Sequence, residues 1–99
     1  MGFLSWFKNT EEAERQEWLA KERLTNAEVL FELNNETKSS GAFKADAFGS
    51  GSFSFWQTAE DIAKGHLDAC YYRGYFKDSD GNTYPVCNIK KAWVRVYAA

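Results

Sequence analysis

Three side chains in the C-terminal half could take part in chemistry: His66, Cys70 and Cys87. His66 and Cys70 are four residues apart, so on a helix they would lie on one face and could touch. A zinc site needs four ligands, and this spacing matches none of the paired cysteine and histidine motifs. The face is expected to be buried, where a thiol is usually inert and has a raised pKa. We expect a structural role for both residues, with a metal site, a nucleophilic cysteine or a Cys70–Cys87 disulfide as alternatives.

A second group, Asp78, Asp80 and Asn82, has the spacing of the first three ligands of a calcium-binding loop. Such a loop also requires glycine at its sixth position and glutamate at its twelfth, where this chain has Thr83 and Ile89. The Asp-Gly pair inside the segment is itself a strong hairpin signal. The segment is therefore predicted to be a hairpin turn that does not bind calcium.

No other grouping of residues identifies an active site. The serines at 39–40 and 50–54 lack the nucleophile-elbow pattern. Glu32 and Asp46 have no identifiable partner carboxylate, and the segment 49–52 lacks the Gly-Lys-Ser/Thr ending of a phosphate-binding loop. The sequence therefore predicts a non-enzymatic protein without a catalytic residue, metal or cofactor.

The last predicted strand, residues 92–97, offers a binding surface instead. Its alternation places Trp93, Arg95 and Tyr97 on one side and small apolar residues on the other. Tryptophan, tyrosine and arginine dominate protein–protein hot spots. The alternative is that the N-terminal helix covers this row, or that the row stacks on neighbouring strands. We expect a partner-binding surface made from these residues: Trp93, Arg95, Tyr97, Trp56, Trp18 and Trp6.

The same row could stack the bases of a single-stranded nucleic acid, with Arg73, Lys90 and Lys91 beside the backbone. The formal net charge of −2, however, gives no basic footprint for phosphate. The aromatic motif of ribonucleoprotein domains is also absent. Charge therefore favours a protein partner. We interpret the chain as an adaptor or inhibitor of the size common in accessory and mobile-element proteins, with single-stranded nucleic-acid binding as the alternative.

The element that positions this surface is predicted to be a helix that begins after Thr58. Thr58 and Asp61 fit a capping box, and Gly74 can adopt the left-handed conformation that ends helices. Gly65 lies inside the helix, where glycine costs about 1 kcal/mol relative to alanine, and tight packing is its expected reason. Residues at three- and four-residue spacing define the buried face: Ala59, Ile62, Ala63, His66, Ala69 and Cys70.

Strands are predicted on both sides of this helix. Alternating apolar residues indicate strands at 28–33, 42–48 and 53–56, which form a meander covered by the helix, with a polar turn at 34–41. A hairpin is expected at 75–87, with Pro85 on an edge strand, before the closing strand. The fold class is therefore α+β: an antiparallel β-sheet of about five to six short strands packed on one central helix, with an additional N-terminal charged helix.

The N-terminal quarter of the chain has a different character. Residues 1–7 are apolar, and a charged helix is predicted from its N-cap Thr10 to Leu24. The apolar stripe of this helix is thin, which predicts that it projects, packs along one edge, or pairs with a second copy as a homo-oligomer. We divide the chain into residues 1–25, the apolar segment with the charged helix, and residues 26–99, the compact α+β domain.

Composition indicates a folded chain, because 44% of its 99 residues are hydrophobic and 17% are aromatic. No apolar run approaches the roughly 20 residues that cross a bilayer. The first seven residues lack the length and the basic start of a secretory signal. The expected location is therefore the cytoplasm, with no membrane span.

Overall fold

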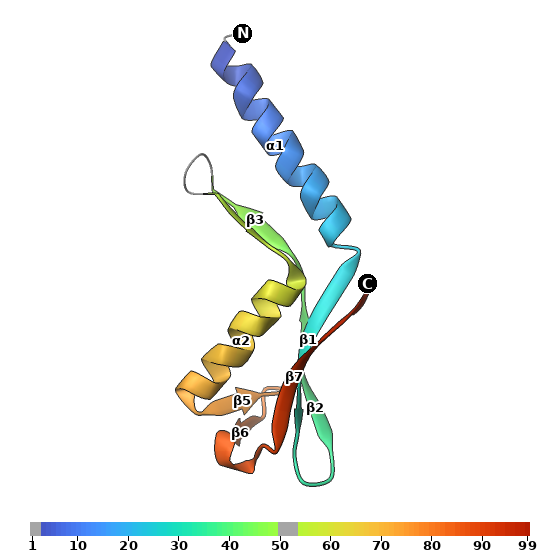
Figure 1. Cartoon of the computed structure of the whole chain (residues 1–99), viewed down its shortest axis with the longest axis vertical. Coiled ribbons are helices and arrows are strands. Elements are labelled where there is room, and N and C mark those ends of the chain that lie inside the picture. The colour runs from blue at the N-terminus through green and yellow to red at the C-terminus, as the bar shows by residue number, and fades with distance from the viewer. Residues whose placement is uncertain (1–2, 50–53) are drawn as a thin grey trace.

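The computed structural model describes residues 3–49 and 54–99, with side chains from residue 11 onward. Figure 1 shows α2 beside the central strands and α1 extending away from them. The predicted α+β class, with antiparallel strands packed on one helix, is confirmed. The elements are α1 (Phe3–Glu22), β1 (Thr25–Glu32), β2 (Thr37–Phe43), β3 (Asp46–Phe48), β4 (Phe55–Gln57), α2 (Ala59–Arg73), β5 (Tyr75–Lys77), β6 (Thr83–Pro85), a 3-10 helix (Val86–Asn88) and β7 (Lys91–Ala98).

In the described part of the chain, the strands are divided among three small antiparallel sheets. The largest has the order β2-β1-β7, while β3 pairs with β4 and β5 pairs with β6. Residues 37–41, predicted as part of a turn, belong to β2, and the predicted strand 42–48 is split between β2 and β3. The turn prediction was wrong because β2 is a polar edge strand, which lacks the alternating apolar pattern. Phe53 lies outside the described residues.

The main core lies between α2 and one face of the β2-β1-β7 sheet. Val29 and Phe31 alternate along β1 and are completely buried. Val94 of β7 packs on the same cluster. Phe76 of β5 also packs in this core, with its ring centroid 5.2 Å from that of Phe31. α2 therefore covers one face of the largest sheet and does not cover the other.

Local capping explains where α2 begins and ends. The Asp61 N–H donates to Thr58 Oγ1 at 3.1 Å, and the Thr58 N–H donates to Asp61 Oδ2 at 3.3 Å, which is the predicted capping box. Gly74 adopts φ 89° and ends the helix as predicted. Ala69, placed on the buried face by its spacing, is exposed because it lies at the border of that face, away from Ala63 at its centre.

Gly65 does not pack tightly, contrary to the prediction. A Cβ atom added there would meet no atom within 4 Å. Gly65→Ala is therefore expected to stabilise the protein by about 1 kcal/mol, because alanine loses less backbone entropy in a helix. The melting temperature, followed by circular dichroism, should rise by about 4–8 °C. Ala69→Gly, at an exposed position of the same helix, is the matched control and should lower it; a decrease for Gly65→Ala would contradict the open surroundings.

The predicted hairpin is confirmed as β5–β6, and the Asp78 carboxylate organises its turn. Asp78 is buried and accepts hydrogen bonds from the N–H groups of Asp80 and Asn82, the Asn82 amide and the Tyr84 hydroxyl, all at 2.9–3.2 Å. Burial acts to raise the pKa of Asp78, but these hydrogen bonds outweigh it and the pKa is lowered. Their stabilisation is present above the ordinary aspartate pKa of 3.8 and is lost as the pH falls through the lower folded value.

The N-terminal helix is longer than predicted. α1 already includes Phe3, so Thr10 lies inside the helix and the predicted N-cap is wrong. The segment from Phe3 to Thr10 contains no proline or glycine, and nothing in it stops a helix. The predicted apolar segment and charged helix are therefore one element.

α1 and the β3–β4 ribbon pack together around a second, smaller cluster. Leu19 of α1 is buried with Ala45 and Ala47, and the Trp18 and Trp56 rings lie 5.3 Å apart. The chain measures 62 × 26 × 19 Å and its radius of gyration is 17.5 Å, against about 13 Å for a compact domain of this length. This arm, defined as α1 with the β3–β4 ribbon, accounts for the elongated shape.

The ribbon departs from the prediction that α2 covers one continuous meander. Phe48 and Phe55 stack with ring centroids 5.4 Å apart, and both remain exposed. Since β3 and β4 pair with each other and not with β1, their apolar side chains lie outside the main core. The part of the meander prediction that concerned Phe55 was therefore wrong.

Candidate functional site

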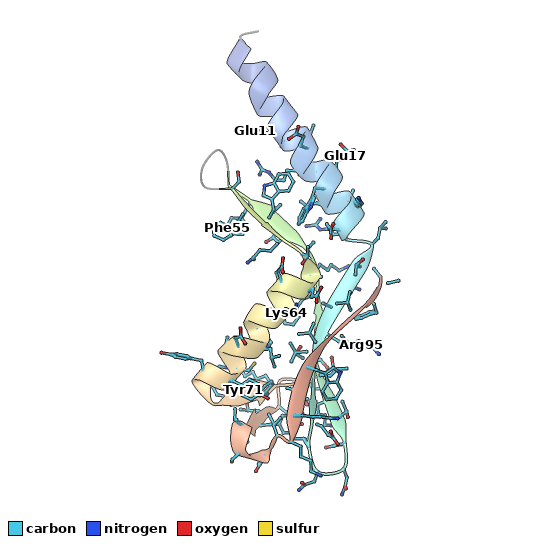
Figure 2. All side chains as sticks on the ribbon, viewed as in Figure 1. Glu11, Glu17, Phe55, Lys64, Tyr71 and Arg95 are labelled. Carbon is cyan, nitrogen blue, oxygen red and sulfur yellow. The ribbon has the colours of Figure 1, made fainter. Side chains whose placement is uncertain are left out.

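The face of the β2-β1-β7 sheet that points away from α2 carries the predicted aromatic row. Residues directly opposite each other in a sheet point to the same side, and the register pairs Trp93, Arg95 and Tyr97 with even-numbered residues of β1. The odd-numbered residues of β1 fill the core. Figure 2 shows Arg95 on the side of the sheet opposite Lys64 and Tyr71 of α2. We define the outer face by eight residues of β1 and β7: Asn26, Glu28, Leu30, Glu32, Lys91, Trp93, Arg95 and Tyr97.

An ion pair lies at the centre of the outer face. Arg95 Nη2 is 2.7 Å from Glu28 Oε1, and the Ser39 hydroxyl of β2 donates to Glu28 Oε2 at 2.6 Å. The Glu28 side chain is 12% exposed and that of Arg95 is 57% exposed. The Glu28 carboxylate is thus buried, and it holds the Arg95 guanidinium in place while that group remains open to solvent.

Cations and aromatic rings alternate along β7. The Arg95 guanidinium lies 4.9 Å from the centroid of the Tyr97 ring, and the Lys91 ammonium lies 5.3 Å from that of Trp93. Lys91 also pairs with Glu32 of β1 at 3.6 Å. Trp93 and Tyr97 are half-buried and Arg95 is exposed. The outer face is therefore aromatic, electrically balanced and fixed by contacts within the sheet.

The structure separates the predicted binding residues into two places. Trp93, Arg95 and Tyr97 lie together on the outer face, whereas Trp18 and Trp56 face each other where α1 meets the ribbon. Trp18 therefore packs on Trp56 instead of covering the row. The side chain of Trp6 lies outside the described side chains.

Glu28 and Asn26, which lie beneath the row, were not predicted from the sequence, whereas Glu32 was noted there without a partner. Asn26 pairs with Tyr97 across the strands, and its Oδ1 atom is buried without a hydrogen-bond partner in the described part of the chain. A buried acceptor in this condition costs about 1–3 kcal/mol. The β1–β7 register, which joins opposite ends of the sequence, was the information needed to find Asn26 and Glu28.

The His66–Cys70 contact is present and is part of the packing. Cys70 Sγ lies 3.5 Å from both His66 Nε2 and Arg73 Nη2, and it is completely buried. Burial raises the pKa of the Cys70 thiol, although the positive charge of Arg73 acts to lower it. The pKa of His66 is lowered, mainly by burial and in addition by the positive charge of Arg73. Because the thiolate is the reactive form, a raised pKa makes the Cys70 thiol less reactive. The stabilisation from neutral His66 is lost as the pH falls below the ordinary histidine pKa of 6.5.

An open pocket of about 600 Å³ lies between the β1–β2 turn and the 3-10 helix. Its lining is largely polar and includes the exposed thiol of Cys87, which donates to the Asn88 side-chain oxygen at 3.8 Å. An amide oxygen does not deprotonate a thiol. Both cysteines are free. Within residues 3–49 and 54–99, no group of three or more His, Cys, Asp or Glu side chains is placed to hold a metal ion.

Comparison with protein-family models, with curated proteins and with solved structures finds no match for this chain. No helix in the described ranges has the length and apolar character needed to cross a membrane. The structure itself therefore defines the class: a small α+β protein whose helix covers one face of an antiparallel sheet and leaves an aromatic face open.

Proposed function

We propose that this chain is a small non-enzymatic protein-binding module, of adaptor or inhibitor type, and that the outer face is its binding surface. The observation that supports this most strongly is the row of Trp93, Arg95 and Tyr97 on a sheet face that α2 does not cover. These residue types supply most of the binding energy in protein interfaces. Both rings are half-buried already, so a partner would meet an ordered surface.

Preorganisation supports the same proposal. Arg95 is held by Glu28 on one side and by the Tyr97 ring on the other. Immobilising a flexible side chain at an interface costs about 0.5–1.5 kcal/mol, and a side chain that is already fixed avoids most of this cost. The guanidinium retains an exposed side for hydrogen bonds to a partner.

The charge balance of the outer face indicates the chemistry of the partner. Lys91 and Arg95 are each matched by a carboxylate of β1. A partner with an apolar centre and little net charge fits such a surface. Single-stranded nucleic acid is the second candidate, because cations beside aromatic rings favour base stacking. Glu28 and Glu32 oppose it, because they lie beneath the cations that a phosphate would contact.

The arm is proposed as a second contact region. Trp56 is exposed at 41% beside Trp18, and Phe48 and Phe55 are exposed on the same ribbon. Phe48 and Phe55 stack on one face of the ribbon, whereas Trp56 points to the other face, toward Trp18 of α1. Exposed apolar groups of this kind commonly mark an interaction site. A cytoplasmic location is part of this proposal, and the free thiols of Cys70 and Cys87 support it, because reducing compartments keep thiols in this state.

Affinity capture from the native lysate tests the outer face. The double variant Trp93→Ala/Tyr97→Ala should lose a partner that the wild type captures, because each hot-spot residue contributes about 2 kcal/mol or more. Tyr72→Ala is the matched control, since Tyr72 is 96% exposed on α2, away from the outer face, and capture should be unchanged. Circular dichroism verifies that each variant folds.

Two results would contradict the proposal. Capture that survives the double variant would exclude the outer face as the binding surface. Binding of a single-stranded oligonucleotide that falls steeply with added salt, and is lost in the same variant, would assign the face to nucleic acid instead. Fluorescence anisotropy of a labelled oligonucleotide at low salt measures the second result.

A further inference from the structure

β7 is an open edge of its sheet. It pairs with β1 on one side, and no strand among residues 3–49 and 54–99 pairs with its other side. β7 is eight residues long and contains no proline, and every residue from Lys91 to Ala98 stays in register with β1. β2, at the opposite edge, is interrupted by a register shift. A long and regular edge is a template for one more strand.

The register identifies the backbone groups that point outward from this edge. The Ala99 N–H donates to the Leu24 carbonyl at 2.9 Å, and this pair continues the register of the β1–β7 ladder. Hydrogen-bonded and non-hydrogen-bonded pairs alternate along an antiparallel ladder, so odd-numbered residues of β7 bond to β1. The N–H and C=O groups that face the open edge therefore belong to the even-numbered residues Ala92, Val94, Val96 and Ala98.

We propose that the strand added at this edge is β7 of a second copy of the chain, antiparallel and related by a twofold axis at Val94. In this register Trp93 lies opposite the partner's Arg95, and Lys91 lies opposite the partner's Tyr97. The twofold axis repeats both pairs. Every cation of β7 then faces an aromatic ring across the new strand pair. On the opposite face Val94 meets its own copy, and Ala92 meets the partner's Val96.

The neighbouring registers lack this complementarity. An axis at Arg95 would place two guanidinium groups opposite each other, and an axis at Trp93 would place Lys91 opposite the partner's Arg95. Like charges directly opposite each other destabilise a sheet. An axis at Val96 would leave Lys91 beyond the end of the partner strand. The alternation of cations and rings on β7 therefore selects the register centred on Val94.

The dimer joins two three-stranded sheets into one sheet of six strands. It covers the edge beside Val96, a side chain that is 45% exposed in the single chain, and it leaves the outer faces of both copies open on one side of the enlarged sheet. This inference goes beyond the proposed binding function and does not rest on it. Its test reads the mass of the particle, whereas the test of the binding function reads partner capture.

Sedimentation of the full chain tests the dimer. The protein concentration should range from about 10 µM to about 1 mM, because a small interface gives weak association. The expected result is a monomer–dimer equilibrium. Val96→Pro removes one outward N–H donor per copy and leaves the β1–β7 ladder intact, so the dimer dissociation constant should rise about tenfold or more. Val96→Ala keeps the N–H group and should remain dimeric. Val96→Lys, which keeps the whole backbone and adds charge at the edge, should also weaken the dimer and serves if the proline variant fails to fold.

Cross-linking tests the register. In a Cys87→Ser background, Val94→Cys should oxidise to a covalent dimer, because the two copies of residue 94 lie opposite each other, about 5.5 Å apart at Cα. Val96→Cys should not, because its copies lie apart. A monomer at all concentrations, a dimer unaffected by both Val96→Pro and Val96→Lys, or cross-linking at 96 instead of 94 would overturn the proposal. A monomer that loses capture of another protein on Val96→Pro would assign the edge to a foreign strand, which also overturns it.

Discussion

Phe31→Ala is expected to lower the melting temperature of the protein by about 20 °C or more. Phe31 is completely buried near the C-terminal end of β1, with its ring centroid 5.2 Å from that of Phe76 and 5.5 Å from that of Tyr84. Removing such a ring costs about 3–5 kcal/mol, because it leaves a cavity that its neighbours fill only in part. The total stability of a small domain is about 5–15 kcal/mol, so the loss is a large share of it.

Phe55→Ala is the matched control for this prediction. It removes the same ring from a strand residue, but Phe55 lies in the arm, is 54% exposed and stacks against Phe48, which is also exposed. Its cost should be about 1 kcal/mol or less, mainly from the lost ring pair. Thermal unfolding by circular dichroism compares the two variants. Similar losses would contradict the division between the main core and the arm.

Arg95→Gln is expected to destabilise the protein more than Glu28→Gln, although both variants break the same ion pair. Removing Arg95 leaves the carboxylate of Glu28, which is 12% exposed, without its cation and with Ser39 as its remaining donor. We expect a cost of about 2–3 kcal/mol, below that of a fully buried pair because Arg95 is half open to water. Removing Glu28 leaves an exposed guanidinium that water can solvate, at a cost of about 1 kcal/mol.

Urea unfolding of both single variants and of the double variant measures this asymmetry. The double variant should recover part of the loss caused by Arg95→Gln, because it no longer contains a buried charge without a partner. Equal losses for the two single variants would show that the carboxylate is not effectively buried. The result also bears on binding, since a loss of capture in an Arg95 variant has to be separated from its loss of stability.

Elements specified by neighbouring residues were predictable from the sequence. The capping box at Thr58 and Asp61, the stop at Gly74 and the turn around Asp78 each depend on residues within a few positions, and each is confirmed. The alternation of the last strand also placed Trp93 and Arg95 on one side. Local conformational preferences are sufficient for such features.

Features that depend on pairing between distant segments were not predictable. The polar residues of β2 resemble a turn until Ser39 is seen to donate to Glu28, which lies on the neighbouring strand. The burial of Glu28 beneath Arg95 depends on the β1–β7 register, which no local pattern specifies. Gly65 was misjudged for the same reason, because its open surroundings depend on how α2 lies on the sheet.

The arm is held together by a small apolar cluster, Leu19 with Ala45 and Ala47, and contributes little to the main core. Segments with few buried apolar contacts open locally at a lower free energy than the body that carries them. Backbone amides in α1 and the ribbon should therefore exchange with deuterated water well before those of β1. A partner that binds the arm would have to restrict this motion, which costs binding free energy, whereas a partner that binds the outer face meets a surface that is already ordered.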